Sequence, residues 1–440
     1  MKDILETLKQ RSDTNWLVKC NSLDFYRDTL RFCHQFKLDE QPTIFIAESN
    51  DYLFLTAFVA AIASESSIFL GNPDWKEQEW KQVYQLVSPD IVVGLCPSSL
   101  PKNIAAKSNL LNKIMIPTGG TSGQIKLAIH TWETLEASVR GFQEYFDVEK
   151  INSYCILPLY HVSGLMQFLR SWHTNGNFFL GSYNQLKGGI LPEINPEEYF
   201  ISLVPTQLQF LLNQYPEWLR KFRTVLLGGA PAWTSLLEQA KQEQINLALT
   251  YGMTETASQV VTLKPQEFLK GNISNGQVLP HANLKFNDEG IIIIEARSLY
   301  LGYYPNLDYP QELVTDDLGY FDEQNNLFIL GRNSQKIITG GENVFPKEIE
   351  NAILFTQLVK DVIVIGISDL KWGQIIIALY VPTIEDLTED LIKQELTHLL
   401  SKYKHPKHWI KVDEIPRNIQ GKINQEQLKA IVTHFLAEKG

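Results

Sequence analysis

The segment Thr118–Lys126 is rich in residues that can surround a polyphosphate. Its glycines leave backbone N–H groups open to a ligand, and its hydroxyl groups can donate hydrogen bonds to phosphate oxygens. At the end of the segment, Lys126 can add a positive charge. The residues that share these properties are Thr118, Gly119, Gly120, Thr121, Ser122 and Gly123. The alternative is an ordinary turn between two strands, so other motifs must decide.

The loop differs from a Walker A motif, in which Lys directly follows the second glycine and a Ser or Thr then opens a helix. Here Gln124 and Ile125 precede Lys126, and Leu127 follows it at the start of an expected strand. A P-loop phosphotransferase is therefore disfavoured.

Five further segments complete a pattern that runs along nearly the whole chain. They are Gly228-Gly229-Ala230-Pro231, Tyr251-Gly252-Met253-Thr254-Glu255, Thr315-Asp316-Asp317, Gly331-Arg332 and Pro416–Ile423, which contains Lys422. In this order, they and the glycine-rich loop resemble the motifs of the adenylate-forming superfamily: acyl-CoA synthetases, firefly-type luciferases and peptide-synthetase adenylation domains. The resemblance implies an enzyme that uses ATP and Mg²⁺ to turn a carboxylate into an acyl-adenylate, and then passes the acyl group to coenzyme A.

Both reactants of the first step are anions, so the site must neutralise charge and hold them in line. By the resemblance, Thr254 contacts the α-phosphate and Glu255 holds Mg²⁺, a hard cation that prefers oxygen ligands. Lys422 would stabilise negative charge at the forming bond. The alternatives are a helix N-cap with an acidic first turn for Thr254 and Glu255, and a solvated lysine for Lys422.

The remaining nucleotide contacts also come from the resemblance. Asp317 would accept hydrogen bonds from the ribose hydroxyls, with help from Arg332; the alternative is a β-turn aspartate and a surface arginine. The other residues assigned to ATP or AMP binding, besides the glycine-rich loop and Lys126, are Gly228, Gly229, Ala230, Pro231, Tyr251, Gly252 and Met253.

One enzyme that catalyses two different half-reactions must rearrange between them, which implies a mobile domain. In the superfamily a small C-terminal domain rotates about a hinge, which would be Ser334 here. Gly340 and Gly341 would line the route of the CoA pantetheine arm, with a plain hairpin turn as the alternative. The chain departs from the usual motifs at Asp316 in place of Gly, Ile125 in place of Pro, Asn418 in place of Thr, and Ser334 in place of Asp or Lys. The change at the hinge leaves the energetics of rotation open.

Three segments resemble one subgroup, the 2-succinylbenzoate:CoA ligases of menaquinone and phylloquinone biosynthesis. They are Leu157–Leu165, Tyr251–Thr262 and Thr339–Pro346. That substrate carries two carboxylates, so the one that does not react needs polar partners, and the residues placed to supply them are Ser258, Gln259 and Thr262. We expect His161 to contact or orient the acyl group; the alternative is a histidine of the core.

Other readings remain open. The chain can be another aryl- or acyl-CoA ligase, a stand-alone adenylation enzyme that loads a carrier protein, or a non-catalytic nucleotide-binding module. The last is disfavoured because Lys422, Glu255 and Asp317 are all present.

Net charge and residue content disfavour several classes of binding partner. The net charge of -11 disfavours nucleic acid and anionic membranes. The cysteines, Cys20, Cys33, Cys96 and Cys155, form no CxxC pair, so a zinc or dithiol site is not expected. The most apolar stretch, Leu53–Ala63, is too short to span a bilayer and predicts a buried helix. We expect a cytoplasmic protein, monomeric or homodimeric, that binds small molecules.

The order of the elements predicts an α/β fold. Short β-branched runs alternate with amphipathic stretches from Pro42 onward, and Thr131 can cap a helix whose apolar residues end at Phe146. The strand-like runs lie at 43–46, 67–70, 91–93, 114–117, 201–204, 225–227 and 247–250. Beyond about residue 280, strands and turns dominate and predict a β-barrel-like part. We expect a large layered N-terminal domain at 1–333 and a small, mobile α+β domain at 334–440, with strands at 362–367 and 375–381 and helices at 391–400 and 425–436.

Overall fold

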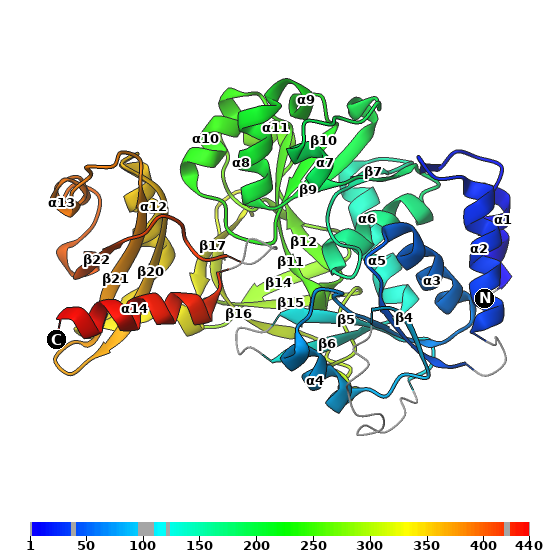
Figure 1. Cartoon of the computed structure of the whole chain (residues 1–440). Helices are drawn as coiled ribbons and strands as arrows, with labels where there is room; N and C mark the ends of the chain where they lie inside the picture. The colour runs from blue at the N-terminus through cyan, green and yellow to red at the C-terminus, as the bar shows by residue number, and fades with distance from the viewer. Residues whose placement is uncertain (1, 37–40, 96–109, 120–123, 418–422, 440) are drawn as a thin grey trace.

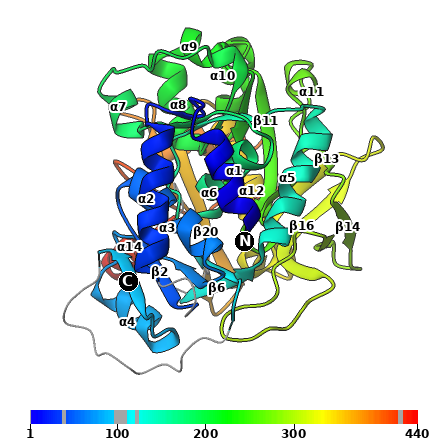
Figure 2. The same ribbon diagram turned by 90° about the vertical axis from the view of Figure 1, so that its right-hand side faces the viewer.

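The computed structural model of the chain describes residues 2–36, 41–95, 110–119, 124–417 and 423–439. In Figure 1 the C-terminal segment, in orange and red, lies at the opposite end of the molecule from the N-terminal helices α1 (Lys2–Arg11) and α2 (Ser22–Gln35), in blue. Figure 2, turned by 90°, shows these two helices side by side in front of the rest. The sheets that build the site lie between the two ends.

The largest sheet is mainly parallel, in the order β1-β8-β7-β9-β10-β11-β12-β13. Its central strands are almost wholly buried, as expected for strands covered by helices on both faces. The strands are β1 Leu17–Val18, β7 Asn152–Cys155, β8 Phe178–Leu180, β9 Tyr199–Leu203, β10 Thr224–Leu227, β11 Leu247–Met253, β12 Ser258–Thr262 and β13 Gln277–Val278. The helices between them are α5 Trp132–Phe146, α6 Val162–His173, α7 Tyr183–Lys187, α8 Pro205–Gln214, α9 Pro216–Arg220, α10 Thr234–Gln242 and α11 Pro265–Leu269.

A second sheet has the order β4-β2-β3-β5-β6. Its strands are β2 Thr43–Ala47, β3 Ser67–Leu70, β4 Ile91–Gly94, β5 Ile114–Gly119 and β6 Ile125–His130, and its helices are α3 Asp51–Ala63 and α4 Glu77–Leu86. Strands β5 and β6 form an antiparallel pair that places Thr118 opposite Lys126, on either side of the glycine-rich loop. The apolar stretch is the buried helix that we expected, and no helix in the described ranges is long and apolar enough to cross a membrane.

The part that we expected to be barrel-like is an antiparallel sheet in the order β14-β15-β16-β17. Its strands are β14 Ala282–Phe286, β15 Ile291–Ala296, β16 Leu313–Phe321 and β17 Leu327–Arg332. The segment after β17 builds a separate sheet of β19-β18-β21-β20, with β22 beside β21. Its elements are β18 Ile337–Thr339, β19 Glu342–Val344, α12 Pro346–Phe355, β20 Val359–Asp369, β21 Gly373–Pro382, α13 Glu389–Leu396, β22 His408–Lys411 and α14 Gln425–Lys439.

Most of the expected elements are present at the expected places. Thr131 caps α5 by accepting a hydrogen bond from the N–H of Thr134. Two expected elements extend past the observed ones: the expected helix at 391–400 ends at Leu396, and the strand expected at 201–204 ends at Leu203. Val204 instead precedes Pro205, which opens α8 at a position where its missing N–H costs nothing. Several other strands are longer than expected, such as β11, expected at 247–250, and β20, expected at 362–367.

Candidate active site

The turn that joins β11 to β12 carries the predicted catalytic pair Thr254 and Glu255. These residues lie in a short 3₁₀ turn, Thr254–Thr256, and not at the start of an α-helix. The two residues that follow, Ala257 and Ser258, have φ angles of 51° and 86°, a left-handed region that L side chains seldom occupy. Backbone strain of this kind persists where the surroundings hold it in place and is concentrated at functional sites.

Side chains from three neighbouring segments hold the backbone carbonyl groups of this turn. A ring nitrogen of His130, Nε2, lies 2.8 Å from the Thr254 oxygen. Ser138 on α5 donates to the Ala257 oxygen at 2.7 Å, and Ser298 donates to the Thr256 oxygen at 2.8 Å. Burial lowers the pKa of His130 to about 4, so its neutral ring donates the Nε2 hydrogen to the carbonyl. The turn is therefore fixed before any substrate binds.

The Glu255 carboxylate is buried, with 8% of the residue exposed. The hydroxyl of Tyr303 donates a 2.6 Å hydrogen bond to Glu255 Oε1. Burial, and then the charge of Glu255, raise the pKa of Tyr303, so this hydroxyl keeps its proton. The ammonium of Lys126 lies 4.9 Å from the centroid of the same tyrosine ring. Tyr303 thus joins the end of the glycine-rich loop to the predicted metal ligand.

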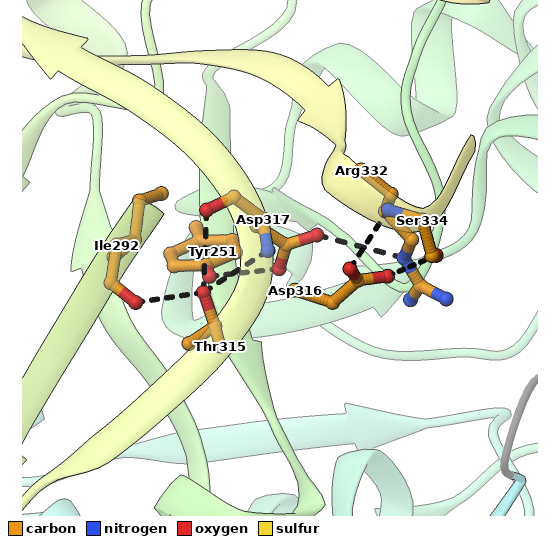
Figure 3. A network of polar contacts seen from close by, with 7 residues as sticks. All are labelled: Tyr251, Ile292, Thr315, Asp316, Asp317, Arg332 and Ser334. Atoms are coloured by element: carbon orange, nitrogen blue, oxygen red, sulfur yellow. Dashed lines mark hydrogen bonds and ion pairs between the residues drawn. The ribbon is translucent and has the colours of Figure 1, made fainter. Parts of the chain in front are cut away.

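Asp317 lies in a second polar network, drawn in Figure 3. Tyr251 donates its hydroxyl to Asp317 Oδ2 at 2.8 Å, and Arg332 Nε lies 3.5 Å from Asp317 Oδ1. Strands β16 and β17 pair so that Asp317 and Arg332 face each other. Burial raises the pKa of Asp317, while Tyr251 and Arg332 act in the opposite direction. The structure therefore brings three predicted nucleotide residues together from three strands.

The predicted hinge residue is tied to the neighbouring acid. The Ser334 N–H donates to Asp316 Oδ1 at 2.9 Å, and the Ser334 hydroxyl donates to Asp316 Oδ2. Figure 3 shows this pair beside the Asp317–Arg332 pair. Asp316 and Ser334 are both departures from the usual motifs, and the structure places them in direct contact.

Three of the four predicted acyl-site residues, Ser258, Gln259 and Thr262, form one chain of contacts around a buried arginine that we did not predict. The side-chain amide of Gln259 donates to Thr262 Oγ1 at 2.7 Å. Arg170 on α6 donates to Ser258 Oγ and to Gln259 Oε1, both at 3.3 Å. The guanidinium also lies 4.2 Å from the centroid of the Phe142 ring.

Arg170 is a buried charge with no anionic partner among the residues that the structure describes. The residue is 2% exposed, its Nε has no hydrogen-bond partner, and no carboxylate within the described ranges lies at ion-pair distance from it. Burial lowers its pKa to about 9. Nearby His281 adds no second positive charge, because burial, Arg297 and Arg170 lower its pKa to about 4. Since buried charges are normally paired, the site is suited to an anionic ligand.

The loop Gly228–Pro231 follows β10 at the carboxyl end of the parallel strands, where ligands bind in open α/β sheets. A Cβ atom at Gly228 would lie 2.4 Å from Thr250 Oγ1, and Gly229 has a φ of 80°. A Cβ atom at Gly252 would lie 2.1 Å from the Ser258 oxygen. These three positions therefore require glycine, with Ala230 and Pro231 completing the loop and Met253 ending β11.

The remaining predicted residues are not part of the hydrogen-bond networks described above. His161 is half-buried at the N-terminus of α6, on the same helix as Arg170, with its ring 4.5 Å from that of Tyr160. Gly340 and Gly341 form the turn between β18 and β19, with φ angles of 60° and 87°, so the hairpin alternative describes their backbone. Thr118 and Gly119 end β5. Five predicted residues lie outside the described ranges: Gly120, Thr121, Ser122, Gly123 and Lys422.

Comparisons with known proteins identify the family of the chain. Residues 100–304 match the model of the AMP-binding enzyme family, and residues 348–422 match that of the AMP-binding enzyme C-terminal domain. The 2-succinylbenzoate–CoA ligase of Listeria innocua is 36% identical over 321 residues, which cover 71% of this chain and 68% of that protein. The enzyme of the same name from Oceanobacillus iheyensis is 34% identical over 333 residues, covering 71% and 68%.

A solved structure shares the fold. The o-succinylbenzoate CoA synthetase (MenE) from Bacillus subtilis, in complex with the acyl-adenylate intermediate OSB-AMP, superimposes with a TM-score of 0.80. It is 24% identical, and the match covers 96% of this chain and 97% of that one. The predicted α/β fold class and the predicted superfamily are confirmed: the chain belongs to the AMP-binding enzyme family.

Proposed function

We propose that the chain is a cytoplasmic 2-succinylbenzoate–CoA ligase of quinone biosynthesis. One carboxylate of the substrate attacks the α-phosphorus of ATP, forming the acyl-adenylate and releasing pyrophosphate. The thiol of CoA then attacks the acyl carbon, and AMP leaves. The observation that carries the choice of acid is Arg170, a buried guanidinium with no carboxylate partner among the described residues. The names of the relatives support the same substrate.

The residues present fit a nucleotide and a divalent cation. Asp317, which accepts from Tyr251 and pairs with Arg332, still offers lone pairs to the ribose hydroxyls. Glu255 keeps one carboxylate oxygen outside its bond to Tyr303, suited to Mg²⁺ that takes its other ligands from phosphates and water. When bound, Mg²⁺ would neutralise phosphate charge. Lys126 would add a second positive charge beside the same phosphates.

Arg170 would hold the carboxylate that does not react. Its contacts to Ser258 and Gln259 orient the guanidinium but do not neutralise its charge. A substrate carboxylate would form the missing ion pair. Ser258 and Gln259 lie on β12, and Thr254 and Glu255 lie in the turn that joins β11 to β12, a few residues before them. Binding the distant carboxylate therefore positions the reacting one at the phosphate, which lowers the entropic part of the barrier.

The two-domain arrangement is part of this proposal, with a boundary between residues 333 and 334. It is supported by the change of sheet there: β17 ends at Arg332, and β18 begins the C-terminal sheet. Ser334 would be the hinge, and Gly340 and Gly341 would line the CoA route in the rotated state. Lys422 would act in adenylation.

Replacing Asp316 with glycine, the residue usual in the family, is expected to loosen the hinge. Two hydrogen bonds between Asp316 and Ser334 are lost, each worth about 1 kcal/mol at an exposed site. Trypsin should cut after Arg332 or Lys336 up to roughly thirtyfold faster, because cleavage follows the population of the open form and about 2 kcal/mol corresponds to that factor. Asp322→Gly, in a turn of the same sheet, is the control and should leave the rate at these two sites unchanged. An unaltered rate in Asp316→Gly would show that the pair does not restrain the hinge.

A ligation screen tests the proposed substrate. Thioester formation is measured with ATP and CoA over 2-succinylbenzoate, benzoates, cinnamates and fatty acids. The expected result is a preference of at least tenfold in kcat/KM for 2-succinylbenzoate. Equal or better use of a mono-acid would contradict the assigned substrate. Transfer to a carrier-protein thiol but not to CoA would show that the acyl acceptor is a carrier protein.

A further inference from the structure

Tyr303 lies between the two oppositely charged groups of the phosphate site. We propose that Tyr303 is a positioning residue with two tasks: its hydroxyl orients the Glu255 carboxylate for a cation, and its ring keeps Lys126 from pairing with that carboxylate. The inference rests on the proposed function for the roles of Glu255 and Lys126, but not on the identity of the acid. Neither the motif pattern nor the resemblance singles out Tyr303.

The hydroxyl is a neutral donor, so it can fix the carboxylate without cancelling its charge. Its 2.6 Å bond occupies Glu255 Oε1 and leaves Oε2 for a ligand. A lysine or arginine in the same place would form an ion pair and compete with the cation. Tyrosine has few rotatable bonds, so its hydroxyl holds the acceptor in one orientation.

The ring separates the charges. The Lys126 ammonium lies over the face of Tyr303, 4.9 Å from its centroid, a favourable cation–π distance. Within the described residues, no ion pair joins Lys126 to Glu255. If the two formed an ion pair, their mutual attraction would withdraw each of them from its ligand.

The backbone around Tyr303 is held on both sides of the site. The Leu301 N–H donates to the Ile129 oxygen at 2.7 Å, and the Tyr304 N–H donates to the Leu127 oxygen at 2.9 Å, so the segment pairs with β6. Lys126 lies on the same strand. Next to it, the Tyr300 N–H donates to the Glu255 oxygen at 2.8 Å. The segment therefore fixes Tyr303 relative to both charged residues.

Tyr303→Phe keeps the ring and removes the hydroxyl. Mn²⁺ is titrated into enzyme saturated with α,β-methylene-ATP, and bound Mn²⁺ is followed by electron paramagnetic resonance, without carboxylate or CoA. We expect Mn²⁺ affinity to fall roughly tenfold, the equivalent of one hydrogen bond to a charged group. Affinity for the metal-free nucleotide should stay within twofold. Tyr320→Phe, the same change at an exposed tyrosine of β16, is the control and should match the unaltered enzyme.

A second pair of variants tests the separation of charges. Tyr303→Leu removes the ring as well and should weaken Mn²⁺ binding further, because Lys126 can then reach Glu255. Adding Lys126→Met to Tyr303→Leu should recover part of the lost Mn²⁺ affinity. Mn²⁺ affinity within twofold of the unaltered enzyme in Tyr303→Phe would overturn the first task, and no recovery in the double variant would overturn the second. Because the acid is absent, failure of the proposed substrate would leave these results unaffected.

Discussion

Replacing Arg170 with methionine is expected to lower kcat/KM for 2-succinylbenzoate by about a hundredfold. Removing one partner of a buried, hydrogen-bonded charge pair commonly costs a few kcal/mol of binding, and each 1.4 kcal/mol is a factor of ten. Methionine has a similar length and fills the space against Phe142. The measurement is the coupled ligation rate over a range of acid concentrations.

Two mono-acid analogues make the test specific, each lacking one of the two carboxylates of 2-succinylbenzoate. The analogue that retains the reacting carboxylate should be used equally well by Arg170→Met and by the unaltered enzyme. Arg140→Met is the matched control, since Arg140 is exposed on α5 and pairs only with Glu136 in the described structure. The melting temperature of Arg170→Met should not fall, because the change removes an unpaired buried charge. A parallel loss with the dianion and the mono-acid would exclude a carboxylate-binding role.

Lys422→Ala is expected to lower the rate of acyl-adenylate formation by at least a hundredfold. The loss of one group aimed at charge that develops in the transition state typically costs a factor of 10² to 10³. The second half-reaction, measured from supplied acyl-AMP and CoA, should stay within a few-fold of the unaltered enzyme, because the proposed rotation withdraws the lysine before the thiol attacks.

The control for this change is Lys429→Ala, which removes an exposed lysine from α14, on the same segment of chain. It should leave both half-reactions unchanged. An equal loss of both half-reactions in Lys422→Ala would contradict the division of labour between two orientations of the C-terminal domain.

Local sequence patterns predicted most elements because those patterns act over short distances. The cap at Thr131 and the β-branched runs need only neighbouring residues to take effect, and the structure has them where expected. The ends expected at 400 and 204 were wrong, because the pattern of apolar residues continues past the observed ends at Leu396 and Leu203.

The candidate site was predicted where a motif is continuous and missed where partners are far apart in the chain. Thr254, Glu255 and Asp317 belong to short motifs, whereas His130, Tyr303 and Arg170 reach the site from other elements. One signal was available for Arg170: Phe168 and Leu169 precede it and Trp172 lies two residues after it, on a helix that is buried along most of its length. A lysine or arginine is seldom fully buried unless it has a partner, so such a position warrants attention.

The contact between Asp316 and Ser334 was also not predictable from the sequence. Each is a separate departure from the motif pattern, and nothing in the sequence links positions 18 residues apart. The pairing of β16 with β17 brings them together and turns two unrelated substitutions into one contact. Paired departures of this kind become visible only once the strand register is known.

The central claim is that this chain joins an acid to CoA through an adenylate. The most direct measurement is exchange of labelled pyrophosphate into ATP, with and without 2-succinylbenzoate and in the absence of CoA. We expect exchange only when the acid is present, with AMP and thioester appearing once CoA is added. Exchange that does not depend on the acid, or formation of ADP and phosphate in place of AMP and pyrophosphate, would contradict it.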